Sequence, residues 1–85
     1  MSRPPRLRLY GRDGCHLCEE ARLGLLRLRG EGLRFELAEV DIEADESLHR
    51  ELLERIPVVE IEGERVGELL IDLDVVRARL ATFGS

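Results

Sequence analysis

Lysine, asparagine, glutamine and tryptophan are absent from this 85-residue sequence, and only three residues are aromatic. No apolar run approaches the roughly 20 residues that a membrane-spanning helix needs. The thirteen basic side chains are all arginines and stand against eighteen acidic ones, for a formal charge of −5. An acidic chain is a poor match for nucleic acid. We therefore expect neither a nucleic-acid partner nor a membrane partner.

The length and composition predict one globular domain over residues 1–85. Hydrophobic residues make up 44% of the chain and charged residues 36%, which is typical of a globular fold and not of a disordered segment. The basic start has no apolar segment of secretory type behind it, because Arg8 interrupts Leu7 and Leu9. We therefore expect a cytoplasmic location, and we expect a monomer.

Both cysteines of the chain lie in the motif Cys15-His16-Leu17-Cys18. The motif follows a strand-like alternation over residues 6–10 and precedes a helical pattern over residues 19–29. A spacing of three residues places both sulfurs on one face of a helix, close enough to bond. In a reducing compartment two cysteines at this spacing are more often catalytic or metal-binding than structural.

The start of the helix favours a reactive thiolate at Cys15. Unpaired backbone N–H groups and the positive end of the helix dipole lie there, so we expect the pKa of Cys15 to fall below that of a free thiol. Leu17, Cys18 and Ala21 begin an apolar stripe along the helix, which predicts that Cys18 is buried and Cys15 exposed. Gly24 lies in the same stripe and predicts a close backbone approach to the sheet.

The remaining elements follow from periodicity and capping signals. Leu33, Phe35 and Leu37 alternate as a second strand, and the apolar parity then switches, which indicates either a bulge or an early strand end. Asp45 is a candidate N-cap for a helix over residues 46–55, which ends before a proline. Strands are predicted over residues 58–61 and 65–69, with a turn between them, and a last helix after Asp72. The order is strand, helix, strand, helix, strand, strand, helix.

This order, the motif at the first helix and Ile56-Pro57-Val58 at the third strand together resemble the thioredoxin fold in its short glutaredoxin form. Residues 9–21, 41–45 and 56–59 resemble a group of small bacterial glutaredoxin-like proteins. The resemblance covers nearly the whole chain. It implies an α/β fold of three layers, in which a four-stranded mixed sheet in the order 2-1-3-4 has the first and third helices on one side and the second on the other.

The resemblance also implies a cis peptide bond before Pro57, placed beside Cys15, with Ile56 offering its backbone to an extended substrate. We predict thiol–disulfide exchange, in which Cys15 attacks a substrate disulfide and Cys18 resolves the mixed disulfide. The expected substrates are protein disulfides or glutathione mixed disulfides, and a reductase is the expected partner. We expect no bound cofactor, and glutathione is a candidate co-substrate.

Three side chains close to Cys15 in the sequence are candidates to modify its reactivity or to bind a substrate. Arg12 could add a positive field or hold a glutathione carboxylate, while Asp13 acts in the opposite sense. His16 favours the thiolate when it is protonated, although residues one apart on a helix do not face each other. We assign His16 and Asp13 a tuning role and Arg12 a substrate-binding role.

Two departures from glutaredoxins concern glutathione. The glutaredoxin motif C-P-Y-C becomes Cys15-His16-Leu17-Cys18, and the late Gly-Gly pair followed by an acid becomes Gly67-Glu68 with Leu70 near the expected acid. Gly67 remains a candidate substrate-binding residue, whereas Glu68 would repel the anionic tripeptide. A dithiol oxidoreductase is therefore the stronger prediction and glutathione dependence the weaker one.

Two other classes of function stay open. One is a metal or iron-sulfur module, in which two chains share a cluster through Cys15; a zinc site is less favoured because His16 and His49 form no second pair of close ligands. The other is a non-catalytic thioredoxin-fold adaptor. We predict no metal ligands for the single chain.

Overall fold

The computed structural model describes residues 3–84 and has the predicted order of elements plus one 3₁₀ turn. None of its helices within those residues has the length and hydropathy of a transmembrane span. In chain order the elements are β1 (Arg6–Gly11), α1 (His16–Gly30), β2 (Glu36–Asp41), the 3₁₀ turn η1 (Ile42–Ala44), α2 (Glu46–Leu52), β3 (Val58–Ile61), β4 (Glu64–Glu68) and α3 (Leu73–Gly84).

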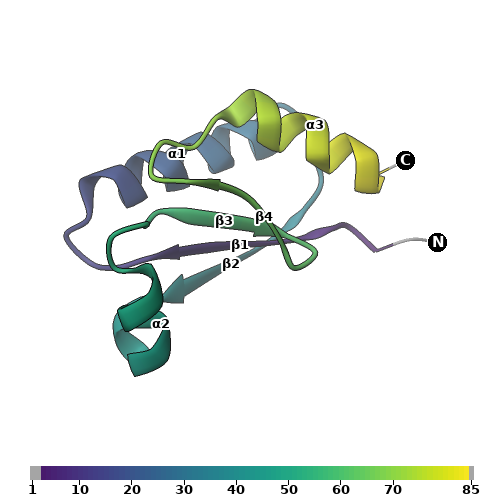
Figure 1. Cartoon of the computed structure of the whole chain (residues 1–85). Helices are drawn as coiled ribbons and strands as arrows, with labels where there is room; N and C mark the ends of the chain where they lie inside the picture. Colours follow the sequence, from purple (N-terminus) through teal and green to yellow (C-terminus); the bar gives the residue numbers. More distant parts are fainter. Residues whose placement is uncertain (1–2, 85) are drawn as a thin grey trace.

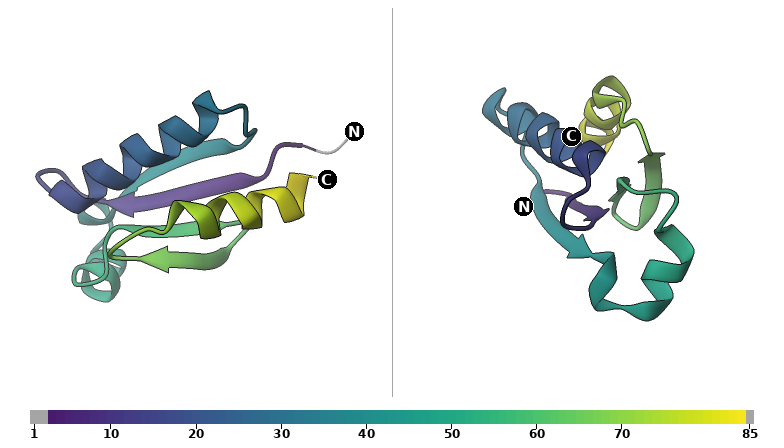
Figure 2. Two further views of the ribbon diagram at one scale, coloured as in Figure 1. Left: turned by 90° about the horizontal axis from the view of Figure 1, so that it is seen from above. Right: turned by 90° about the vertical axis from the view of Figure 1, so that its left-hand side faces the viewer.

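The four strands form one mixed sheet in the order β2-β1-β3-β4, which confirms the predicted fold class. β1 pairs with β2 in parallel, and β3 pairs antiparallel with both β1 and β4. Helices α1 and α3 cover one face of this sheet, and α2 lies on the other (Figures 1 and 2). The ends of β1, β2 and β4 and the start of β3 therefore meet at one end of the sheet.

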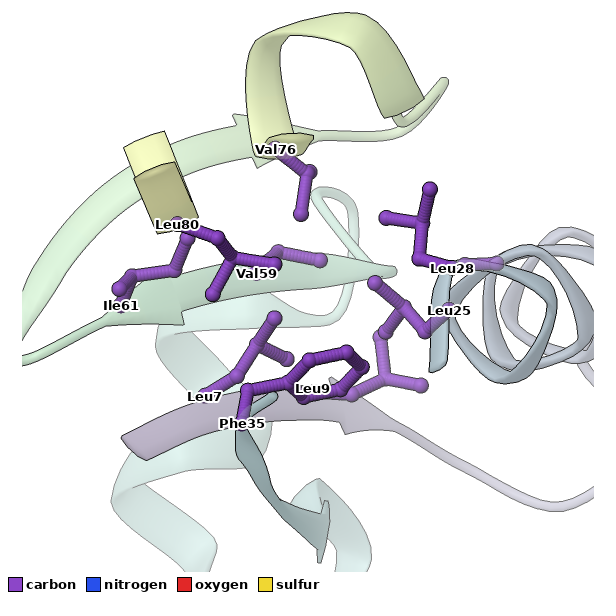
Figure 3. Close-up of a cluster of buried hydrophobic side chains, with 10 residues drawn as sticks. Leu7, Leu9, Leu25, Leu28, Phe35, Val59, Ile61, Val76 and Leu80 are labelled. Carbon is purple, nitrogen blue, oxygen red and sulfur yellow. The ribbon is translucent and has the colours of Figure 1, made fainter. Parts of the chain in front are cut away.

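Two apolar clusters hold these layers together. The larger one joins α1 and α3 to the sheet, and Figure 3 shows its side chains converging from both helices onto β1 and β3. Its buried members are Leu7, Leu9, Ala21, Leu25, Leu28, Phe35, Val59, Ile61, Val76 and Leu80. The smaller one lies on the α2 side and consists of Tyr10, Cys18, Ile42, Leu52, Ile56 and Val58.

The second strand begins later than the sequence predicted. β2 starts at Glu36 and pairs with β1 in continuous register, so both explanations offered for the parity switch, a bulge and an early end, are wrong. Leu37 packs against the larger cluster, whereas Val40 packs against the smaller one. The apolar parity changes along β2 because the strand contributes to both covered faces of the sheet.

Helix α2 is shorter than predicted, because it ends at Leu52 rather than at residue 55. Residues 53–55 form a turn, consistent with the restriction that Pro57 places on the backbone before it. The predicted cap is confirmed: the Asp45 carboxylate accepts hydrogen bonds from the N–H groups of Ser47 at 2.9 Å and Leu48 at 3.2 Å.

The β3–β4 hairpin turns at Glu62-Gly63, where both residues have positive φ, at 50° and 84°. Such angles are typical of the two-residue turns that match the twist of a hairpin. Glutamate is an unusual first residue here, and its carboxylate accepts a hydrogen bond from the Arg6 N–H at 2.7 Å. A register shift between Val59 and Glu60 places a bulge in the ladder at Val66. The fourth strand begins and ends one residue before the predicted span.

Two predictions about the buried stripe of α1 are wrong. Leu17 is 37% exposed instead of buried. Gly24 does allow a close approach, but its neighbour is α3 and not the sheet: a Cβ at Gly24 would lie 3.0 Å from Cδ1 of Leu73. The apolar pattern of α1 predicts which side of the helix is buried. It does not predict which element packs against that side at each position.

The contrast between two leucines of α1 tests this packing. Leu25 is fully buried in the larger cluster, whereas Leu23 is 52% exposed. We expect Leu25→Ala to lower the free energy of unfolding by about 2–5 kcal/mol, because it removes buried methyl groups and leaves a cavity. The matched change Leu23→Ala should alter it by no more than about 0.5 kcal/mol. Urea denaturation of both variants measures the difference, and equal losses would contradict the assignment of the core.

Candidate functional site

Cys15 is the N-cap of α1, as its position before the helical pattern predicted. Its backbone is extended, with φ −88° and ψ 109°, and its Sγ accepts a hydrogen bond from the Cys18 N–H at 3.2 Å. The sulfur thus occupies the place where a serine or aspartate oxygen usually caps a helix. The positive end of the α1 dipole and an oriented N–H group therefore both face this sulfur.

Cys15 and Cys18 are joined as a disulfide, with their Cα atoms 5.2 Å apart. Cys15 is half-buried, whereas Cys18 is only 7% exposed and belongs to the smaller apolar cluster. The predicted division into an accessible sulfur and a buried one is confirmed. Cys15 is therefore the more accessible residue of the two.

Gly11, the last residue of β1, lies directly against the buried sulfur. A Cβ at this position would be 3.0 Å from Sγ of Cys18 and 3.1 Å from its Cβ. The strand thus runs one residue past the alternation predicted over residues 6–10. A glycine at the end of the strand lets the first turn of α1 lie close to β1.

An open cavity of about 610 Å³ lies beside the cysteine pair and is lined by both cysteines. Arg12, Asp13 and His16 line it too, so the structure brings the three predicted modifiers to the same place. The His16 side chain is 89% exposed, and its Nε2 lies 3.9 Å from Oε1 of Glu20, one turn along α1. His16 therefore has a carboxylate as its charged neighbour.

The sequence reasoning missed an ion pair in this cavity. Arg22 of α1 donates from Nε to Oε1 of Glu39 in β2 at 3.0 Å, and both side chains line the cavity. The helical spacing from Cys18 to Arg22 could have placed the arginine on this side. Glu39 could not be found in this way, because its position depends on the register that sets it opposite Leu9.

The Ile56–Pro57 peptide bond is cis, and Pro57 is fully buried. Ile56 lies in the same apolar cluster as Cys18, and Cys15 packs against that cluster. The Ile56 N–H donates to the Leu52 carbonyl at 3.0 Å and is therefore not available to a bound chain. Of the backbone groups that Ile56 was expected to offer, only the carbonyl remains.

Gly67 lies in β4, opposite Val59, and does not line the cavity that contains the cysteines. Its neighbour is Ile71, whose Cδ1 would lie 3.4 Å from a Cβ at this position. No group of three or more His, Cys, Asp or Glu side chains suited to a metal ion occurs among residues 3–84.

A family model for a glutaredoxin-like domain (DUF836) matches residues 6–81. The chain belongs to this glutaredoxin-like family. The family predicted from the motif and the element order is thereby confirmed. A comparison with curated proteins finds no match.

Two solved structures share both sequence and fold with this glutaredoxin-like domain. The solution structure of protein Ne2328 from Nitrosomonas europaea is 36% identical, with 93% of this chain and 94% of that chain covered and a TM-score of 0.75. The X-ray structure of protein XcR50 from X. campestris is 32% identical, with 89% and 96% covered and a TM-score of 0.70.

A more distant likeness supports the fold alone. A mutant thioredoxin from Halobacterium salinarum is 20% identical and superposes with a TM-score of 0.66, over 98% of this chain and 77% of that one. Together these findings show a thioredoxin-like fold in a glutaredoxin-like family, with a cysteine pair at disulfide distance.

The contact between Gly11 and Cys18 can be tested by adding one methyl group. We expect Gly11→Ala to lower the free energy of unfolding of the oxidised domain by about 1–3 kcal/mol, because the new Cβ overlaps the sulfur. Gly30→Ala is the matched control, since a Cβ there meets nothing within 4 Å. Urea denaturation of the two variants measures the difference, and a Gly11→Ala domain as stable as the control would show that β1 and α1 do not approach as described.

Proposed function

We propose that this glutaredoxin-like domain is a thiol–disulfide oxidoreductase with Cys15 as the nucleophile and Cys18 as the resolving thiol. The observation that carries the proposal is the sulfur cap of α1: Cys15 Sγ is half-buried, accepts the Cys18 N–H and is bonded to the buried Cys18. In the reduced protein the same N–H and the helix dipole stabilise a thiolate at Cys15. A thiolate, and not a thiol, is the attacking species in exchange.

The proposed reaction has two steps, each of which forms one S–S bond and breaks another. The Cys15 thiolate attacks one sulfur of a substrate disulfide, the substrate S–S bond breaks, and the other substrate sulfur leaves as a thiolate. Cys18 then loses its proton and attacks Cys15 Sγ, which releases the second substrate sulfur. Two electrons pass to the substrate, and the domain is left with the Cys15–Cys18 disulfide.

Another thiol must return the domain to its reduced form. Two molecules of glutathione or the dithiol of a reductase can supply the two electrons. The exchange itself needs no cofactor on this domain, because the electrons pass directly between sulfur atoms. Arg12 and Asp13 line the cavity beside Cys15, as does the Arg22–Glu39 ion pair, so an incoming reductant meets charges of both signs there. We propose protein disulfides and glutathione mixed disulfides as substrates in a reducing compartment.

Trapping of the intermediate tests this proposal. We expect reduced Cys18→Ser protein to accumulate a mixed disulfide at Cys15 when mixed with a disulfide substrate, because the second step is lost. Intact-mass spectrometry before and after dithiothreitol measures the adduct. Cys15→Ser is the matched control and should form at least tenfold less adduct, since Cys18 is buried.

The opposite results would separate the alternatives. Absence of any adduct with glutathione disulfide and with protein disulfides would overturn exchange. Equal adducts on the two variants would overturn the assignment of Cys15 as the attacking sulfur. Unchanged partner binding by Cys15→Ser, with no exchange by the wild type, would indicate an adaptor.

A further inference from the structure

Exposed apolar side chains gather on the flank of α1, from Leu17 between the two cysteines toward the turn before α3. Six large hydrophobic side chains are exposed among residues 3–84, and three of them, Leu17, Leu69 and Leu70, line one hollow between α1 and the turn that precedes α3. Their exposed fractions are 37%, 44% and 78%. Single exposed leucines need no explanation, but a cluster of them that includes Leu17 of the cysteine motif is typical of a contact surface.

Backbone hydrogen bonds fix the turn that carries Leu69 and Leu70. Leu69 has φ 65°, which side chains of L-residues rarely adopt, and its N–H donates to the carbonyls of Pro57 at 2.8 Å and Arg55 at 3.1 Å. The turn is therefore fixed to the segment around the cis peptide. Figure 1 shows this turn, the start of β3 and the start of α1 at one end of the sheet. The turn that carries Leu69 and Leu70 therefore lies at the same end of the sheet as the cysteine motif (Figure 1).

The hollow is small and nearly uncharged. It has a volume of about 150 Å³, and Glu20 is the single charged residue among those that line it. Apolar cavities of this order hold a molecule the size of benzene. The hollow has room for one aliphatic or aromatic side chain, and it provides no cation for the carboxylates of glutathione.

We infer that the hollow is a specificity site for protein substrates, which takes one apolar side chain next to the substrate disulfide. This inference rests on the proposed exchange activity. The occupant must react with Cys15, so it must belong to a disulfide-bonded chain, and Leu17 is only two residues from that sulfur. An apolar wall with one carboxylate selects a neutral or basic segment and disfavours an anionic tripeptide. Leu70 is the principal contact, because it is the most exposed of the three.

A single-turnover experiment tests the inference without any external reductant. Reduced wild-type protein is mixed with an excess of a peptide disulfide that carries leucine beside its cysteine, or with the same peptide carrying serine, and the second-order rate constants are compared. We expect the leucine peptide to react about tenfold faster, within the range that one apolar side chain contributes to selectivity. Leu70→Ser should reduce this ratio to about two or less.

Leu23→Ser is the matched control, because Leu23 is an exposed leucine of α1 that does not line the hollow. It should retain the tenfold ratio. Equal rates for the two peptides with the wild type, or equal ratios for Leu70→Ser and Leu23→Ser, would overturn the docking site. A faster reaction with glutathione disulfide than with the leucine peptide would overturn it as well.

Bis(2-hydroxyethyl) disulfide, which has no side chain to place in the hollow, separates this inference from the proposed function. Reaction of the wild type with this small disulfide, together with no preference between the peptides, overturns the docking site and leaves exchange intact. Absence of reaction with all disulfides overturns exchange and the docking site together.

Discussion

The hydrogen bond from the Cys18 N–H to Cys15 Sγ is the interaction around which this end of the molecule is arranged. It forms because Cys15 is the N-cap of α1, and the absence of a side chain at Gly11 lets the first turn of this helix lie against the end of β1. In this arrangement Cys15 is half-buried, whereas Cys18 lies in the apolar interior. The reactivity that we propose is a property of a helix end and not of any single acidic or basic side chain.

Each of the two apolar clusters positions a different part of the structure around Cys15 and Cys18. The larger one fixes α1 and α3 on the sheet and so determines where the helix begins. The smaller one surrounds Cys18 and includes Ile56, which brings the segment before β3 up to the cysteines. A domain of 85 residues has little apolar surface to bury, and here each cluster both stabilises the fold and places part of the site.

The order of elements and the cysteine pair could be predicted from local signals, whereas the sheet order and the sides on which the helices lie came from the resemblance to glutaredoxins. The cysteine spacing, the alternation in β1 and the Asp45 cap each act within a few residues. The errors arise where the outcome depends on a distant element. Leu37 and Val40 serve different faces of the sheet, Gly24 lies against α3, and Glu39 reaches Arg22 only because of strand register. Leu17 is likewise exposed although it lies on the apolar stripe of α1.

The main-chain groups around Pro57 are largely occupied inside the protein. The Ile56 N–H is bonded to Leu52, and the carbonyls of Arg55 and Pro57 share the Leu69 N–H. A polypeptide lying along this segment therefore meets few free main-chain partners, unlike one that extends an open sheet edge. Under the proposed function, side-chain shape would therefore supply much of the affinity at this place, and exchange of surface residues would change the substrate while the scaffold stays the same.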